Sequence, residues 1–357
     1  HLILCGCLAQ KKGAELLKTG ADVILGTQYR GKAVELLEEA VSSGHPVCAV
    51  EPLRPDTPYE SLFVSAQTER TRATLKIQEG CNNRCTYCII PSVRGPIRSR
   101  PLRDICEEAV RLSEAGYSEI VLTGIHLSSY GRDLKDGTSL LTVLETLQAV
   151  PGILRIRLGS LEPRVITEDF AARLQKLNVC PHFHLSLQSG SDATLRRMKR
   201  RYDTALFLEV CERLRRYFPH CSLTTDLICG FPGESEEEFA ETLAFIRRCD
   251  FAAMHIFPYS VRPGTLAEKL PGKLPAKTKN ERAAAAIAAA DEMERAYLQN
   301  CVGSTLSVLF ETEEDGSVRG HAENYTEVRV PLSGLRGQVL DTVITGVEDK
   351  VLLGRLL

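Results

Sequence analysis

The sequence has no apolar run that approaches the roughly 20 residues of a membrane-spanning helix, and we therefore expect no membrane association. Its longest alanine-rich stretch, residues 282–296, is bounded by charged residues and predicts a water-soluble helix. It has no basic leader with a cleavage site, which argues against a secretory signal peptide. It also lacks an initial methionine and opens in what looks like the middle of a strand, so we expect the natural N-terminus to lie upstream.

The sequence also has little net charge, with a formal value of −2 at pH 7. It gives no global sign of nucleic-acid binding, so any such surface must be local. Its 13 cysteines lack the dense, even spacing of a small secreted disulfide framework. A reducing cytoplasm is the better account, with a few thiols used for chemistry and the others buried as small apolar residues.

Strand and helix patterns alternate from residue 73 onward. Short apolar stretches cover 74–78, 119–124, 154–160, 183–188, 223–230 and 253–257. Helical patterns between them cover 102–115, 139–149, 166–177, 203–217 and 235–248. This alternation predicts a parallel sheet with helices outside it. Six units are too few for a closed eight-stranded barrel, so we expect an open, partial (β/α)6 barrel with its chemistry on the loops after the strands.

The two ends of the chain have a different character. Residues 1–44 show a β-α-β-α pattern typical of the remainder of a small α/β domain, and residues 51–72 carry three prolines and resemble a linker. A long helix over 276–299 closes the central unit, and about five short strands over 302–357 predict a small OB-like β-barrel. At 357 residues, the chain should hold two or three domains. We divide it into residues 1–66, 67–299 and 300–357.

The clearest motif is C-x3-C-x2-C in the loop after the first strand of the predicted barrel, formed by Cys81, Cys85 and Cys88. Three thiolates on one flexible loop can hold three irons of a [4Fe–4S] cluster and leave the fourth iron open to a small molecule. A zinc site is the alternative, but it would need a fourth ligand, and no His or Cys lies nearby at metal-ligand spacing. Because an open position distinguishes a catalytic metal site from a closed one, the motif favours a catalytic cluster.

Glycine and polar residues in this loop and after other strands are candidates for binding a cofactor. Glycines let a backbone approach a ligand closely, and polar side chains at strand ends lie where a ribose could bind. The alternative for each is an ordinary β-α turn, or simple packing for the tyrosine. The candidates are Tyr87, Gly124, Glu162, Gln188, Ser189, Gly230 and Pro232.

With these motifs the chain resembles the radical S-adenosylmethionine (SAM) superfamily. The string GCNNRCTYCIIPSVRGPIRSRP, together with LTGIHLSSYG, LSLQSGSDATLRRMKRRY, TDLICGFPGESEEEF and HIFPYSVRPGT, is similar to one branch, the methylthiotransferases. LTGIH and CNNRCTYCIIPSVRGPIRSR are most similar to the enzymes that act on N6-threonylcarbamoyladenosine at position 37 of tRNA. The resemblance implies SAM bound to the open iron, its reductive cleavage to a 5′-deoxyadenosyl radical, and conversion of the nucleoside to its 2-methylthio derivative.

The resemblance also implies a second, auxiliary [4Fe–4S] cluster held by three cysteines of an N-terminal domain. Cys7 in GCLAQ matches the last of these three, whereas the other two would lie upstream of the first residue. Cys5 lies two residues away, but its spacing does not match the family. A reducing electron donor is an implied partner, and we expect the protein to act as a monomer.

The C-terminal string GHAENYTEVRVP (320–331) is similar to the TRAM module, an RNA-binding β-barrel. Such barrels bind looped RNA on one face, which suits the anticodon loop of tRNA. A second basic run, at 196–201, could meet phosphates or form a solvated helical face. The candidates for RNA contact are Arg94, Arg98 and Arg100 after the cysteine loop, and Tyr325 and Arg329 in the predicted barrel.

Other functions remain open from the sequence. The nearest are a methylthiotransferase for isopentenyladenosine in tRNA and one for an aspartate of a ribosomal protein. A more distant alternative is an RNA-binding protein that keeps a structural iron–sulfur cluster without turnover.

Overall fold

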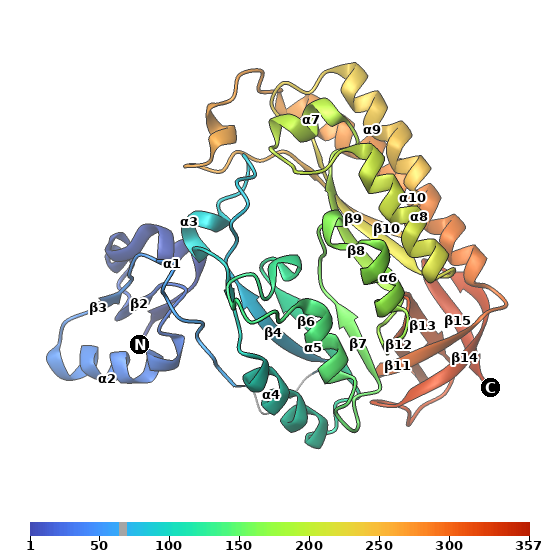
Figure 1. Ribbon diagram of the computed structural model, residues 1–357, viewed down its shortest axis with the longest axis horizontal. Coiled ribbons are helices and arrows are strands. Elements are labelled where there is room, and N and C mark those ends of the chain that lie inside the picture. The colour runs from blue at the N-terminus through green and yellow to red at the C-terminus, as the bar shows by residue number, and fades with distance from the viewer. Residues whose placement is uncertain (64–69) are drawn as a thin grey trace.

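The computed structural model describes residues 1–63 and 70–357. Figure 1 shows a central unit of strands and helices, with a small N-terminal α/β region on one side of it and a C-terminal β-barrel on the other. These are the three kinds of region expected from the sequence, and the predicted boundary between the first two, at residues 66 and 67, lies outside the described residues.

Six parallel strands form the wall of the central unit. They are β4 (Ala73–Glu79), β6 (Glu119–Gly124), β7 (Arg155–Leu158), β8 (His182–Gln188), β9 (Ser222–Cys229) and β10 (Ala253–Pro258). The first three are hydrogen-bonded neighbours, and so are the last three. Isolated parallel bridges, such as that between Leu161 and Leu185, join the two halves. This arrangement confirms the predicted partial barrel.

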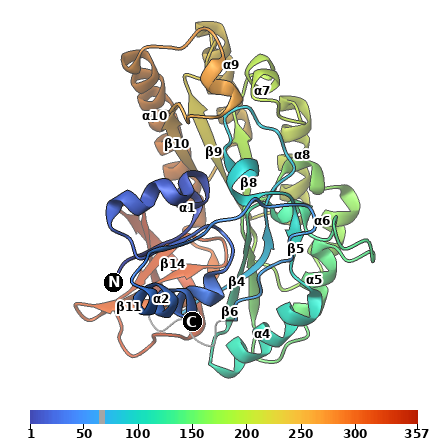
Figure 2. The ribbon, with the colours of Figure 1, turned by 90° about the vertical axis from the view of Figure 1, so that its left-hand side faces the viewer.

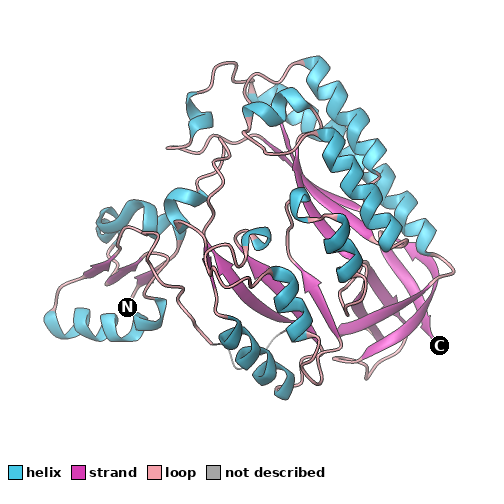
Figure 3. Cartoon of the chain, viewed as in Figure 1, coloured by secondary structure: helices cyan, strands magenta, loops and turns pink. Residues whose placement is uncertain are grey.

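Helices cover the outer face of this wall (Figure 3). They are α4 (Leu102–Glu114), α5 (Leu140–Leu147), α6 (Glu168–Leu174), α8 (Thr204–Tyr217), α9 (Glu236–Cys249) and α10 (Ala276–Cys301). Their starts carry local signals: Ser235 and Glu238 form a reciprocal capping box at α9, and the Asp203 side chain caps α8. The apolar faces of most of these helices meet the outward side chains of the strands in one continuous core.

Several short elements were not predicted from the sequence. They are β3 (Val47–Ala49), α3 (Ile90–Arg94), β5 (Arg98–Ser99) and α7 (Asp192–Arg197). Each is too short for a hydrophobic period to show. β5 pairs antiparallel with the end of β4, Arg98 opposite Glu79, so the chain after the cysteine loop folds back onto the strand before it.

The N-terminal region is a parallel sheet of β1 (Ile3–Leu4), β2 (Val23–Leu25) and β3, with helices α1 (Cys7–Lys12) and α2 (Ala33–Ser43). The helix predicted after β1 changes to a 3-10 helix at Gly13, whose φ is +53°. α1 packs against α3, and Figure 2 shows this region on the side of the central unit where β4 lies. The N-terminal region therefore contacts the segment that follows the cysteine loop.

The C-terminal region is a closed barrel. Its strands are β11 (Thr305–Glu314), β12 (Ser317–Ala322), β13 (Glu327–Val330), β14 (Val339–Glu348) and β15 (Val351–Leu356), in the order β11-β12-β13-β15-β14. Leu298 and Cys301 at the end of α10 pack into the barrel core, so this helix joins the two regions. The closed barrel confirms the small β-barrel expected from the sequence. Of the helices that the structure describes, none is long and apolar enough to cross a membrane.

Candidate active site

The three cysteines of the motif lie on the loop that leaves the carboxyl end of β4. Cys81, Cys85 and Cys88 line one cavity of about 370 Å³. Burial raises the pKa of the Cys81 and Cys88 thiols. Within residues 1–63 and 70–357, no three His, Cys, Asp or Glu side chains already stand at metal-binding distance from one another. The fit to a cluster rests on the donor chemistry of three thiols facing one cavity, and the ligand assignment stays a prediction.

Backbone contacts at Thr86 and the conformation of Gly80 fix the path of the cysteine loop. The N–H of Thr86 donates to the carbonyl of Met198 at 3.0 Å, and the carbonyl of Thr86 accepts from the N–H of Ala267 at 2.8 Å. Gly80 has a φ of +72°, and a Cβ there would lie 1.9 Å from the carbonyl oxygen of Pro96. Only glycine fits that position, so the loop leaves β4 along one path.

The side chain of Arg200, which was not among the site residues predicted from the sequence, lies beside Cys85. Arg200 Nη1 lies 3.3 Å from Cys85 Sγ, and its Nε donates to the hydroxyl of Tyr202 at 2.9 Å. The guanidinium places a positive charge next to the sulfur that the motif predicts as a metal ligand. The basic run at 196–201 is thus divided, because Arg197 instead donates to Glu238 at 2.9 Å.

Glu162 lies among polar groups next to the cysteine loop. Its Oε1 accepts from Arg164 Nε at 2.6 Å, and its Oε2 lies 3.1 Å from His126 Nε2 and 3.4 Å from Asn83 Nδ2. Burial disfavours its charge, but hydrogen bonds from His126 and Arg164 outweigh burial and hold the pKa of Glu162 well below its usual value. Since Asn83 belongs to the loop, the structure brings an ionised carboxylate to the cysteines. Its contact with a cofactor stays a prediction.

The predicted cofactor residues after β6 and β8 have strong local constraints. A Cβ at Gly124 would lie 2.9 Å from Cβ of Gln78, so a neighbouring side chain already requires glycine there. Gln78 in turn accepts from the N–H of His126 at 2.7 Å. Gln188 adopts a φ of +72°, which is uncommon for a non-glycine residue and marks a constrained backbone, and Ser189 is fully buried.

The turn after β9 is held by its own contacts. Gly230 has a φ of +73°, and its N–H donates to Glu234 Oε2 at 2.7 Å. Arg282 Nη1 lies 2.7 Å from the same carboxylate oxygen, and the carbonyl of Pro232 accepts from Arg197 Nε at 3.2 Å. These contacts account for the glycine and the proline without a ligand, so the predicted cofactor contact at this turn stays untested.

A second cavity, of about 590 Å³, lies between the cysteine loop and the N-terminal region. Cys7 and Cys88 both line it, together with Tyr87 and Phe257. The Sγ of Cys7 accepts from Arg94 Nε at 3.0 Å. The structure therefore brings the two predicted cluster regions to one cavity, although they belong to different parts of the chain.

Comparison with known proteins points to the same chemistry. Residues 75–246 match the protein family described as "Radical SAM superfamily". "Threonylcarbamoyladenosine tRNA methylthiotransferase MtaB" of Bacillus subtilis is 40% identical over 91% of this chain and 74% of its own length. "tRNA-2-methylthio-N(6)-dimethylallyladenosine synthase" of Pelotomaculum thermopropionicum is 36% identical over 99% of this chain and 81% of its own length. The chain belongs to the radical SAM methylthiotransferase family. The expected cofactors, a [4Fe–4S] cluster and SAM, are those of this family.

A solved structure supports the fold of this methylthiotransferase. The radical SAM methyltransferase TsrM from Kitasatospora setae aligns over 88% of this chain and 61% of its own chain, with a TM-score of 0.53 and 14% sequence identity. At this identity the likeness shows a shared fold alone. It agrees with the partial barrel built by β4 and β6–β10.

The structure corrects two of the RNA contacts expected in this methylthiotransferase. Arg98 and Arg100 are only 3% and 2% exposed, and Arg100 Nη2 lies 2.6 Å from Glu108 Oε2. The expectation that they meet RNA phosphates is wrong, because β5 folds back onto β4 and buries both side chains. Arg94 is also occupied, since its Nη1 lies 3.1 Å from Glu79 Oε1 while its Nε faces Cys7.

The two contacts expected in the C-terminal barrel lie in different surroundings. Arg329 forms an ion pair with Glu348 on the barrel surface. Tyr325 lies at the boundary with the central unit, where its ring stacks on His182 and His321 with centroid distances of 4.7 and 4.9 Å. Tyr325 therefore packs between the two regions while 43% of the residue remains exposed, and its contact with RNA stays a prediction.

Proposed function

We propose that this protein converts N6-threonylcarbamoyladenosine at position 37 of tRNA to its 2-methylthio derivative. The observation that carries the proposal is the cavity shared by Cys7 and Cys88. It brings the residue expected to serve the sulfur-carrying cluster next to the loop expected to generate the radical. The names of the relatives from Bacillus subtilis and Thermotoga maritima, 40% and 36% identical to this chain, support the same substrate.

The chain's thiols suit the cofactors of the family. Cys81, Cys85 and Cys88 would hold the SAM-binding cluster, and Cys7 would be one ligand of the auxiliary cluster. When bound, the cluster and SAM supply the radical that removes hydrogen from an aromatic carbon, which has no acidic proton for a base to take. Arg200 would stabilise the ligating thiolate of Cys85, 3.3 Å away.

The residues around the cavities would orient the reactants. The ionised carboxylate of Glu162 can accept hydrogen bonds from a cationic amino group, such as that of SAM. Phe257, 53% exposed and lining the cavity beside Cys7, offers a flat apolar face on which a base can stack. Apolar walls at this cavity would keep water away from a reactive intermediate.

Methylthiolation of dimethylallyladenosine is the second candidate, favoured by the relative from Pelotomaculum thermopropionicum at 36% identity. The two substrates share adenine and differ in the N6 group, which carries a carboxylate in threonylcarbamoyladenosine and is apolar in dimethylallyladenosine. Arg262 lines the cavity with Cys7, and its guanidinium has no hydrogen bond or ion pair within the described residues. An unpaired cation there favours the anionic substrate.

The proposed function also implies binding partners, an oligomeric state and a cellular compartment. The tRNA would present its anticodon loop to the cavity and contact the C-terminal barrel, which resembles a TRAM module. A reducing electron donor would deliver the electron that SAM cleavage requires. We propose that the protein acts as a monomer in the cytoplasm, where thiols stay reduced.

Nucleoside mass spectrometry tests the proposal. The anaerobically reconstituted protein is incubated with SAM, a chemical reductant and tRNA that carries either threonylcarbamoyladenosine or dimethylallyladenosine. We expect 2-methylthio-threonylcarbamoyladenosine from the first tRNA. A product from the second tRNA alone would establish the other candidate. No 5′-deoxyadenosine with either tRNA would leave an RNA-binding protein with a structural cluster.

A further inference from the structure

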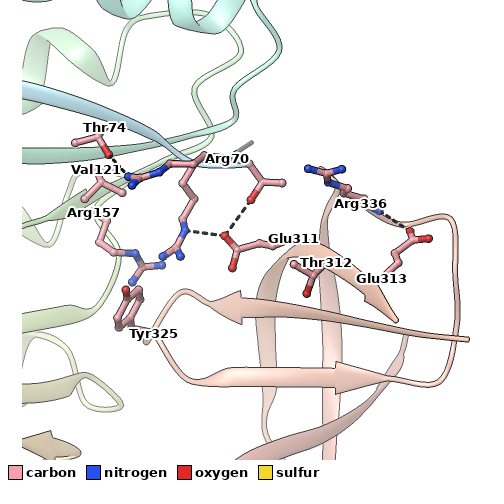
Figure 4. Close-up of a pocket in the computed structure, with 11 residues that line it drawn as sticks. Arg70, Thr74, Val121, Arg157, Glu311, Thr312, Glu313, Tyr325 and Arg336 are labelled. Atoms are coloured by element: carbon pink, nitrogen blue, oxygen red, sulfur yellow. Dashed lines mark hydrogen bonds and ion pairs between the residues drawn. The ribbon is translucent and has the colours of Figure 1, made fainter. Parts of the chain in front are cut away.

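A cavity of about 790 Å³ lies where β4, β6 and β7 meet the C-terminal barrel, away from the cysteine loop. We call it the boundary pocket. Figure 4 shows that its side chains come from the segment leading into β4, from β7 and from the C-terminal barrel. The residues that matter for its charge are Arg70, Arg72, Arg157, Arg336, Glu311 and Glu313.

Arginine outnumbers acid in the boundary pocket. Among the described residues, four arginines and two glutamates line it, an excess of two formal positive charges. Two of the arginines already have a partner: Arg157 Nε donates to Glu119 at 2.8 Å, and Arg72 Nε donates to Glu311 at 2.8 Å. Glu311 also accepts from Thr71 at 2.9 Å and contacts His321, so its acceptor capacity is largely used.

The other carboxylate of the pocket is held by backbone. Glu313 Oε1 accepts three N–H groups in the turn of residues 334–336, at 2.9, 3.0 and 3.2 Å. It fixes the turn that carries Arg336, and no side-chain cation neutralises it among the residues described. Glu313 therefore fixes the backbone position from which the Arg336 side chain extends.

The other two arginines are nearly free. Among the described residues, Arg70 Nη1 reaches only the hydroxyl of Thr74, at a long 3.4 Å. The guanidinium of Arg336 has no hydrogen bond or ion pair within the described chain, and both side chains are exposed. In Figure 4 they lie on either side of Glu311. Two guanidinium groups from separate segments, neither with an acidic partner among the described residues, therefore share one open pocket.

We propose that the boundary pocket binds the phosphate backbone of the RNA substrate, with Arg70 and Arg336 as separate contacts, an inference that rests on the proposed function. Guanidinium groups match the oxygens of a phosphate with paired N–H donors. The chain has a net charge of only −2, so its attraction for RNA must come from local arrangements of this kind.

The size and place of the pocket favour RNA over a small anion. A volume of about 790 Å³ far exceeds that of one phosphate group. Tyr325, 43% exposed, lines the same cavity and offers an aromatic edge to a sugar or base. Thr74 in the pocket precedes Glu79, the last residue of β4, by five residues, which places the pocket on the order of 17 Å along the strand from the start of the cysteine loop. An RNA with one base in the active site could reach it with a neighbouring part of its backbone.

Salt-dependent binding tests this inference. Affinity for threonylcarbamoyladenosine-containing tRNA is measured by fluorescence anisotropy over a series of KCl concentrations, for the wild type and for Arg70→Ala/Arg336→Ala. We expect about tenfold weaker binding and a slope of log Kd against log [KCl] that is lower by about one to two. Arg70→Lys/Arg336→Lys should keep most of the slope, because it keeps both charges.

A matched control removes two arginines elsewhere. Arg103→Ala/Arg173→Ala deletes exposed side chains, 86% and 43% exposed, that lie outside the boundary pocket. This control should bind tRNA as the wild type does. An equal loss in the control would show a general charge effect and overturn the inference.

The remaining outcomes separate the inference from the proposed function. If the wild type methylthiolates tRNA and the Arg70/Arg336 variant binds it with unchanged affinity and slope, the inference is wrong while the proposed function stands. If tRNA binds through these arginines but no methylthio product forms, the inference stands and the proposed function fails. Calorimetric binding of inorganic phosphate, lost in the variant while tRNA affinity is kept, would assign the pocket to a small anion instead.

Discussion

The two ends of the central sheet use polar groups in opposite ways. At the carboxyl ends, the thiols of the cysteine loop line a cavity and remain available to a ligand. At the amino ends, the carboxylate of Glu119 accepts from Arg155 Nε at 2.6 Å and from Arg157 Nε at 2.8 Å. The same arginines donate to backbone carbonyls of the C-terminal barrel, including those of Ser307 at 2.7 Å and Glu323 at 2.9 Å. We call the carboxyl end of the sheet, where the thiols line a cavity, the open end. We call the amino end, where the arginines hold the C-terminal barrel, the closed end.

This difference has an energetic basis. Burial disfavours the charge of Glu119, which is fully inaccessible, but Arg157 and Arg155 outweigh it and lower its pKa. A buried carboxylate between two guanidinium groups is stable only while all three are present. We call Glu119, Arg155 and Arg157 the amino-end network, and it holds the C-terminal barrel in a fixed position relative to the active site. An RNA that binds both the active site and the boundary pocket would require this fixed position.

The largest expected effect is at the open end. Cys85→Ala should reduce 5′-deoxyadenosine formation from SAM to background, because it removes one of the three thiols expected to ligate the cluster. Cys249→Ala should leave this activity nearly intact, since Cys249 is buried in α9 and lines neither active-site cavity. The product is quantified by chromatography after anaerobic reconstitution, with iron content measured in parallel. Equal losses in both variants would refute the ligand assignment.

At the closed end, Glu119→Gln should lower the free energy of unfolding by about 3–5 kcal/mol, because it leaves two buried guanidinium groups without a counter-charge. Urea unfolding followed by circular dichroism measures the change. Glu145→Gln is the matched control: its partner is Arg173 on the surface, where both side chains are more than 40% exposed, and the expected change is below about 1 kcal/mol. Similar values for the two variants would mean that the amino-end network does not fix the barrel.

The sequence predicted the open end better than the closed end. The strand and helix periods are local, and Cys81, Cys85 and Cys88 lie in one short stretch, so their shared loop follows from the chain itself. The burial of Arg98 and Arg100 depends on β5 returning to β4, a pairing that no local period encodes. The same holds on a larger scale for the amino-end network, where Arg155 and Arg157 of β7 donate to carbonyls that lie 152 and 166 residues later along the chain.

Individual side chains were missed for the same reason. Arg200 belongs to a basic run for which phosphate contact and a solvated helical face were both open from the sequence, but the backbone after α7 directs it to Cys85 while Arg197 turns to Glu238. Tyr325 was expected to contact RNA because of its motif, whereas its stacking on His182 depends on how the barrel docks. Residue type and spacing predicted the ligands, and tertiary packing decided the orientation of their neighbours.

The acid sensitivity of the boundary should follow from Glu311. Burial opposes its ionisation, but His321 and Arg72 outweigh burial and lower its pKa to about 2. Its contribution is therefore complete above its unfolded pKa of about 4.3 and is lost as the pH falls toward 2. Glu311→Gln should cost about 1–3 kcal/mol near neutral pH, and the difference from wild type should shrink between about pH 4.5 and 2.

Unfolding by urea at several pH values checks this prediction. Glu314→Gln, an exposed position on the same strand, should follow the wild type at each pH. A constant difference between Glu311→Gln and the wild type down to pH 2 would show that the ion pair with Arg72 is not what the substitution removes.

The smallest effect is expected on the outer surface of the C-terminal barrel. Arg329 pairs with Glu348, and their side chains are 33% and 56% exposed, so Arg329→Ala should change the free energy of unfolding by less than about 1 kcal/mol. Because Glu348 already occupies this guanidinium, tRNA affinity should fall by no more than about twofold, which anisotropy titration beside the Arg70→Ala/Arg336→Ala variant can resolve. A loss as large as that of the boundary-pocket variant would place the RNA on the outer strands β13 and β14. The boundary between the barrel and the central unit would then serve only to hold the two regions together.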